Sequence, residues 1–434
     1  MTTKPPPAAG ETTAPETTPR TEPRTAAPAP AARASRAFAP DIARGLMLLA
    51  VMIANTTFYI TGREPGLLMR PTDPGPADRV VDVLSALFID NRAYPMFAFL
   101  FAYGVHQIVS RQAARGVPWR RTAWLLTKRD AWLLGIGVLH TVLLFPGDII
   151  TSYALCGFVL ILLVRAPGWA LWSVFAFSFL WNALVSTADA LSVSGLLSEQ
   201  ELDAQLDSLT ASVEAPTASA GLLARIELLP LSLLNQPFFV PALLAPMSLG
   251  LLLARRSVLE RPWERPRLVA TLGWTGLACA VLGGAPLAWG LAFGFEPSPM
   301  WLLASSLSNA TGVLAGVGWP CLIALALARL QRRHDVDPSA RPGPAGRALQ
   351  ALGKRSMSGY LAQSVFSVLL FPAYSLDLGS RLGTFGMTAA GVGVWLLTLS
   401  GAVLLERADR PGPMEWLLRR LVYGRPRRVR EDGA

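Results

Sequence analysis

The chain has 434 residues, of which 52% are hydrophobic and only 16% are charged, and its formal net charge is +10. Soluble domains usually carry about 25% charged residues, so this composition excludes an ordinary soluble protein. The positive charge does not indicate a nucleic-acid partner, because Lys and Arg gather in alternate loops, as the positive-inside rule describes. We therefore predict a polytopic membrane protein embedded in the lipid bilayer.

Both ends of the chain are polar. Residues 1–40 are rich in Pro, Thr and Ala and contain no apolar segment, so we predict a disordered tail. This tail lacks the apolar core of a secretory signal and is expected to stay in the cytoplasm. Residues 425–434 are expected to form a second, short cytoplasmic tail. The sequence between them, 41–424, is interpreted as one transmembrane helical domain.

Apolar runs of 17 to 25 residues, the length that crosses about 30 Å of hydrocarbon, recur through this domain. Their lengths, flanking charges and helix breakers predict an all-α bundle of about ten spans. The segment 79–91 is apolar but contains Asp82 and Asp90, and we interpret it as an amphipathic or re-entrant approach to the second span. The predicted spans are 44–62, 93–110, 130–146, 150–166, 168–189, 234–254, 267–292, 307–330, 357–375 and 383–405.

Loop charges predict the orientation of the bundle. The loops after the second, sixth and eighth predicted spans are basic, whereas residues 189–228 carry seven acidic residues against one arginine. Basic loops stay in the cytoplasm, so both termini are predicted to be cytoplasmic and the acidic loop to lie outside. We expect a multi-pass protein of the cell membrane.

The stretch 137–157 contains the leading candidate site. It places His140 and Asp148 within or beside sequence of bilayer depth, where ionisable groups cost a few kcal/mol and usually face the bundle interior or a water-filled cavity. The third span runs outward from Asp130, so His140 lies about 15 Å along it. A neutral imidazole beside a carboxylate is a workable general base. The alternative is a helix-packing histidine and an acid at the membrane rim.

Four further polar residues interrupt predicted spans and are candidate substrate-binding residues. Arg92 opens the second span, Tyr153 lies in the fourth and Gln363 in the ninth. We expect these three to line a cavity with the His140 site. Asn55, in the first span, equally suits a hydrogen bond between helices.

Several chemical signals are missing from the sequence. No G-x-x-x-x-G-K-[ST] phosphate loop is present, which argues against an ATP-driven pump. The three cysteines lie in apolar segments and suggest neither a disulfide framework nor a metal site. We predict no metal and no bound cofactor.

Short blocks of residues after position 40 share their order and spacing with a known family. The blocks are Asp41-x-x-Arg44-Gly45, Asn55, Arg92-x-Tyr94-Pro95, His140 followed by Gly147-Asp148, Tyr153, Gly353 to Ser364 and Gly412 to Arg419. Together they resemble the YeiB-like family of bacterial membrane proteins (domain of unknown function 418), which is largely uncharacterised. That family is similar to the transmembrane acyltransferases that include heparan-glucosaminide acetyltransferase.

The resemblance implies transfer of an acyl group from a cytoplasmic donor, with acyl-CoA as co-substrate, to a hydroxyl or amine near the outer face. The acceptor would be a small molecule or a glycan. In this role His140 would be the general base, and Asp148 would orient it or bind the acceptor. One rival is a proton-coupled small-molecule transporter or permease, in which His140 and Asp148 form the proton site. A non-catalytic membrane scaffold is the third alternative.

The predicted orientation has a direct test. Cysteines introduced beside Asp203 should react with a membrane-impermeant thiol reagent in whole cells, because the acidic loop is expected outside. Cysteines introduced beside Arg115 should react only after the cells are opened. The opposite labelling pattern would invert the bundle and the placement of His140.

Overall fold

The computed structural model describes residues 1–4, 37–64, 66–191, 210–294 and 299–424. The described helices all belong to one unit, Arg36–Ala434. The predicted tail 425–434, most of the tail 1–40 and part of the acidic loop, 192–209, lie outside the described residues. Within the described residues the fold is helical and contains no β-strand, which confirms the all-α prediction.

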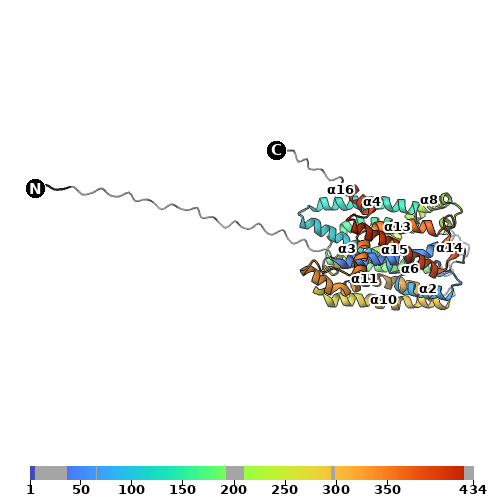
Figure 1. The fold of residues 1–434 in the computed structure, drawn as a ribbon. Coiled ribbons are helices and arrows are strands. Elements are labelled where there is room, and N and C mark those ends of the chain that lie inside the picture. Colours follow the sequence, from blue (N-terminus) through green and yellow to red (C-terminus); the bar gives the residue numbers. More distant parts are fainter. Residues whose placement is uncertain (5–36, 65, 192–209, 295–298, 425–434) are drawn as a thin grey trace. The chain divides into compact units, whose positions relative to one another are not determined.

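Long helices run alongside one another, with α4 near one edge of the bundle and α10 near the opposite edge (Figure 1). Short helices and 3-10 turns connect them. In chain order the elements are α1 (Phe38–Thr56), η1 (Thr57–Tyr59), η2 (Leu67–Met69), α2 (Pro76–Phe88), α3 (Ala93–Ala114), α4 (Trp119–Leu143), α5 (Ile150–Leu163), α6 (Gly168–Leu191), α8 (Ala218–Leu234), α9 (Gln236–Ala254), η4 (Pro262–Glu264), α10 (Pro266–Phe293), α11 (Pro299–Val336), α12 (Pro344–Gly353), α13 (Ser356–Leu370), α14 (Leu378–Arg381), α15 (Thr384–Arg407) and α16 (Pro413–Tyr423).

Each predicted span falls on a helix, and six helices in the described residues are long and apolar enough to cross a membrane. The six segments are Phe38–Tyr59, Gly168–Thr187, Gln236–Ala254, Pro266–Phe293, Leu303–Val336 and Thr384–Arg407. The protein is therefore an integral membrane protein with several spanning helices. The remaining four predicted spans correspond to α3, α4, α5 and α13. Of these, α5 has 14 residues and α13 has 15, so they reach only about 21 and 22 Å. A total of ten spans stays a prediction.

The first helix begins earlier than the sequence indicated. Residues 38–40 were assigned to the disordered tail, but α1 starts at Phe38, and this boundary was wrong. The ring of Phe38 packs against His334 with centroids 4.5 Å apart, and the N–H of Ala39 donates to Gln331 Oε1 over 3.3 Å. These contacts with α11 stabilise the start of α1. The composition of residues 38–40 does not predict them, because the partners are distant in the sequence.

Two other segments differ from the predicted spans. The approach to the second span is a separate helix, α2, in which Asp82 is buried against Arg70 with 2.8 Å between Nε and Oδ1. The predicted outer loop contains most of α8, which was not anticipated. Arg225 and Pro230 interrupt the apolar run there, so the sequence did not predict a helix in this segment.

Large apolar side chains cover the outside of the bundle. Leu162 is 77% exposed, and Leu180 and Leu282 on α6 and α10 are also exposed. Inside, Met47, Phe99 and other buried residues of α1, α3, α9 and α11 form the largest core cluster. An outer surface of this kind matches lipid tails rather than water.

Helices α10 and α11 approach each other through glycines. A Cβ added to Gly276 of α10 would lie 2.5 Å from the Cα of Gly318 on α11. Real Cβ atoms do not approach a backbone so closely, so the two helices would have to separate. Membrane helices commonly pack at small residues because lipid gives them no hydrophobic drive to associate.

We expect Gly276→Ala to destabilise the fold by about 1–3 kcal/mol, because the added methyl overpacks this contact. Gly393→Ala in α15 is the matched control, since its Cβ would meet no atom within 4 Å. Thermal unfolding in detergent measures both. An unchanged melting temperature for Gly276→Ala would show that the α10–α11 contact is looser than described.

Candidate functional site

The structure brings the two predicted catalytic residues into contact. His140 lies in the last turn of α4, and Asp148 lies in the connection to α5. The distance from His140 Nδ1 to Asp148 Oδ1 is 2.8 Å, and the side chains are 0% and 1% exposed. In the neutral tautomer that carries its proton on Nδ1, toward this carboxylate, Nε2 presents its lone pair.

The turn between α4 and α5 creates this contact. The N–H groups of Leu144 and Phe145 both donate to the carbonyl of His140, and α4 ends at Leu143, three residues after the histidine. Asp148 Oδ2 accepts the N–H of Thr151 in the first turn of α5 over 2.8 Å. The positive end of α5 therefore stabilises the negative charge of Asp148.

A glycine allows α5 to start close to α4. A Cβ on Gly137 would lie 2.5 Å from the backbone nitrogen of Thr151. Thr151 is the residue that holds the carboxylate of Asp148, so this close approach also places that carboxylate beside His140. The short hairpin thus sets the geometry of the pair.

The second nitrogen of His140 faces helix α13. His140 Nε2 lies 2.8 Å from Ser364 Oγ, and both side chains are buried. In the tautomer with the proton on Nδ1, Nε2 accepts the hydroxyl proton of Ser364. Tyr360, one turn earlier on α13, packs its ring on the imidazole with centroids 5.1 Å apart. A carboxylate, an imidazole and a hydroxyl are therefore arranged in series.

Gln363 is the predicted substrate-binding residue that lies next to this series in the chain. It directly precedes Ser364 on α13 and is 3% exposed. In the described part of the chain, its buried Nε2 has no hydrogen-bond partner. A buried donor without a partner costs about 1–3 kcal/mol, so a bound carbonyl or hydroxyl oxygen would relieve that cost.

Tyr153 lies on the same hairpin, one turn into α5. Its hydroxyl donates to the carbonyl of Tyr94 over 2.8 Å, and its ring meets Phe97 edge to face. These contacts join α5 to α3. Asn55, at the end of α1, is half-buried, and no contact that we observe connects it to His140.

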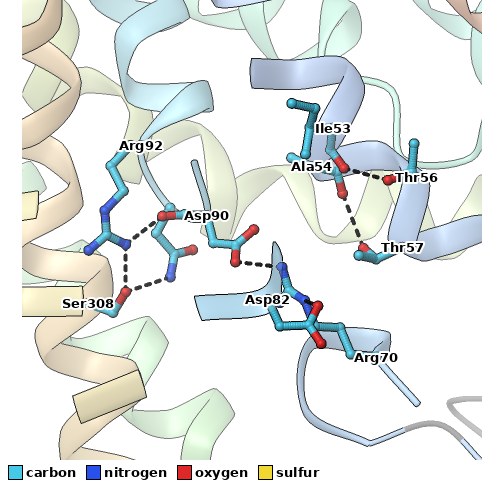
Figure 2. A network of polar contacts seen from close by, with 10 residues as sticks. Ile53, Ala54, Thr56, Thr57, Arg70, Asp82, Asp90, Arg92 and Ser308 are labelled. Carbon is cyan, nitrogen blue, oxygen red and sulfur yellow. Dashed lines mark hydrogen bonds and ion pairs between the residues drawn. The ribbon is translucent and has the colours of Figure 1, made fainter. Parts of the chain in front are cut away.

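Arg92 belongs to a second polar network (Figure 2). Its Nη1 donates to Ser308 Oγ over 2.7 Å, and its Nη2 donates to the carbonyl of Ala280 over 3.0 Å. The guanidinium therefore joins α3 to α10 and α11. The observed contacts of Arg92 do not include His140 or Asp148, so the structure does not bring it to the predicted site.

Arg70 and two carboxylates adjoin Arg92 in this second network (Figure 2). Arg70 lies 2.8 Å from Asp82 and 2.8 Å from Asp90, and the backbone carbonyl of Asp90 accepts from Arg92. Arg70 thus pairs with both carboxylates, whereas Arg92 is held by a hydroxyl and two backbone carbonyls. We interpret this network as structural, because its two guanidinium groups join neighbouring segments of the bundle through carboxylates, carbonyls and a hydroxyl.

Three residues that support or complete the site were not assigned from the sequence. Ser364 appeared only as the last residue of the block Gly353 to Ser364. Arg225 donates through Nε to the carbonyl of Val142 over 2.9 Å and so satisfies the end of α4 beside His140. Its signal in the sequence was a lone arginine in an acidic loop. The third residue, Glu415 in α16, accepts backbone N–H groups at the start of α13.

Glu415 caps the helix that carries Ser364. Its Oε1 accepts the N–H groups of Met357 and Ser358 over 2.9 and 3.1 Å, and its Oε2 accepts the Ser358 hydroxyl. An added Cβ on Gly412 would lie 2.0 Å from Glu415 Oε2, so glycine is needed beside the cap. This contact joins the blocks 353–364 and 412–419 in the structure.

We expect Glu415→Ala to lower the stability of the protein by about 1–2 kcal/mol, because the first N–H groups of α13 would lose their acceptor. Glu264→Ala is the control, since Glu264 forms only an exposed pair with Arg261. Thermal unfolding of both variants measures the difference. Equal melting temperatures would contradict the capping role.

Comparison with known proteins gives a family and relatives without an assigned activity. Residues 253–425 match the family described as "Protein of unknown function (DUF418)". The chain is 23% identical over 416 residues to the uncharacterized protein YxaH of Bacillus subtilis (strain 168), covering 88% of this chain and 93% of YxaH. It is 24% identical over 405 residues to the uncharacterized protein YeiB of Escherichia coli (strain K12), covering 88% and 95%. The family match includes Ser364 and Glu415, whereas His140 and Asp148 precede it.

Proposed function

Since the chain belongs to the YeiB-like DUF418 family, whose compared members have no assigned activity, we propose a function from its own geometry: it is a transmembrane acyltransferase. The observation that carries this proposal is the buried series of Asp148, His140 and a hydroxyl, with both contacts at 2.8 Å. Such a series activates an oxygen for attack on a carbonyl carbon.

The proposed chemistry uses His140 as an acid–base group. Its Nε2 accepts a proton from an attacking hydroxyl or amine, and the resulting imidazolium is stabilised by Asp148. His140 then returns the proton to the leaving group of an activated acyl donor, such as the thiol of acyl-CoA. Because the series is buried, the charges that develop are little screened by water.

The position of His140 suits a reaction near the outer face. The basic residues of α4 lie in its first turns, while His140 lies 21 residues after Trp119, about 31 Å along the helix. We propose that both termini and the basic loops are cytoplasmic in a cell-membrane protein. The acyl group of a cytoplasmic donor would then move along most of the length of α4, across the membrane, before it reaches a hydroxyl or amine of a small molecule or glycan.

A proton-coupled transporter is the second candidate function. The observation that favours it is the burial of a titratable pair, His140 and Asp148, within a helical bundle. In that case flux through proteoliposomes would depend on a proton gradient. The unmodified protein would then transfer no acyl group from acyl-CoA.

We expect His140→Gln to reduce acyl transfer by about 100-fold or more, because the amide keeps polarity but cannot take up a proton. Asp148→Asn should also reduce turnover, since a neutral amide does not stabilise imidazolium. Purified protein with radiolabelled acetyl-CoA and a panel of hydroxyl and amine acceptors provides the assay.

His334→Gln is the matched control, because His334 is also buried but packs against Phe38 at the start of α1. It should retain activity. Folded His140→Gln and Asp148→Asn proteins with full activity would assign the pair a packing role and overturn the proposal.

A further inference from the structure

We propose that Ser364 is the nucleophile of this site and that the acyl group passes through a covalent ester on its Oγ. The inference rests on the proposed function and deepens it, because it replaces direct transfer to the acceptor by two successive transfers. It follows from which hydroxyl the imidazole contacts in this structure.

The three side chains occur in the order that activates a serine. Asp148 Oδ1 lies 2.8 Å from His140 Nδ1, and His140 Nε2 lies 2.8 Å from Ser364 Oγ. They come from three separate segments: the α4–α5 connection, α4 and α13. Catalytic triads on unrelated folds share these roles and distances, so the arrangement is identified by geometry and not by sequence order.

The bond usual for a helical serine is the longer of the two that Ser364 makes. A serine or threonine in a helix commonly donates to the carbonyl four residues earlier. Thr141 and Ser400 do so over 3.0 and 2.8 Å. Ser364 Oγ lies 3.4 Å from the corresponding carbonyl of Tyr360, well beyond its 2.8 Å distance to the imidazole. The imidazole is therefore the nearer of its two partners, and in the tautomer with the proton on Nδ1 the hydroxyl donates to Nε2.

The first transfer balances with an acyl thioester as donor. Ser364 Oγ attacks the acyl carbon while its proton passes to His140 Nε2, so a C–O bond forms. The C–S bond then breaks, and the thiolate leaves with the proton that His140 returns. The products are the free thiol and an ester on Ser364, with His140 neutral again.

The second transfer reverses these roles. A hydroxyl or amine of the acceptor gives its proton to His140 Nε2 and attacks the ester carbon. The bond from that carbon to Ser364 Oγ breaks, and the oxygen recovers the proton from His140. The acceptor leaves acylated, and both residues return to their starting states.

In this proposal the buried amide of Gln363 is the donor for the acyl oxygen in both steps. Its Nε2 is buried and has no partner within the described residues, and it precedes the nucleophile by one position. Each tetrahedral intermediate places a negative charge on the former carbonyl oxygen. A donor that is already desolvated stabilises that charge without further reorganisation.

The test is covalent labelling of the intact, detergent-purified protein. A fluorophosphonate reacts with an activated serine by forming an O–P bond and releasing fluoride, and it requires no knowledge of the natural donor. Mass spectrometry of the peptide that contains Ser364 should show the adduct. Ser364→Ala should lose it, and His140→Gln should slow its formation by about 100-fold or more.

Ser367→Ala is the matched control for labelling. Ser367 lies on the same helix and is equally buried, but its hydroxyl contacts Met52 Sδ and not the imidazole. It should be labelled at Ser364 like the unmodified protein. With acetyl-CoA as donor, an acetyl adduct on Ser364 should appear, and Ser364→Ala should lower transfer by about 1,000-fold or more.

The outcomes separate this inference from the proposed function. Transfer from acetyl-CoA that persists in Ser364→Ala, without an adduct in the unmodified protein, overturns the nucleophile and leaves direct transfer through His140. Labelling of Ser364 without transfer to any acceptor supports the nucleophile but overturns the acyltransferase. Absence of both labelling and transfer overturns both proposals.

Discussion

Within lipid, a buried polar group finds its partners only in the protein itself, and this constraint organises the bundle. Arg92 reaches Ser308 and thereby joins α3 to α11. His140 meets Asp148 on one side and Ser364 on the other, which joins the α4–α5 hairpin to α13. The apolar side chains that cover the outside are interchangeable against lipid tails. The polar contacts are directional, so they determine which helices lie together.

Close approach of helices makes those contacts short. In the α4–α5 hairpin, Gly137 faces Thr151, and Gly157 faces the carboxylate of Asp130. A Cβ at either glycine would occupy space that the opposite helix already fills. The two helices of the hairpin are therefore packed tightly at both ends. This packing fixes the backbone that holds the carboxylate of Asp148 beside the imidazole.

The proposed reaction draws on the same features that stabilise the fold. The helix end at Asp148 favours its negative charge, the carboxylate lies beside Nδ1 of the imidazole, and Nε2 of the imidazole lies beside the hydroxyl of Ser364. Glu415 and Arg225 act at a distance from the reacting atoms: one caps the start of α13, and the other satisfies the end of α4. Both contacts pair backbone groups at the ends of the two helices that carry His140 and Ser364.

The sequence by itself determined the class of protein, the helices and the first pair of the site. Apolar runs of spanning length specify membrane helices, and the few residues between His140 and Asp148 permit only a tight turn, so their proximity was predictable. The partner of His140 Nε2 was not predictable, because Ser364 lies 224 residues away and polar residues occur in several spans. For the same reason the sequence assigned Arg92 to the His140 site, whereas its contacts are with Ser308, Ala280 and Asp90. Only the tertiary structure decided which polar residues meet, because helix packing is set by glycine contacts and hydrogen bonds between segments that have no local signature.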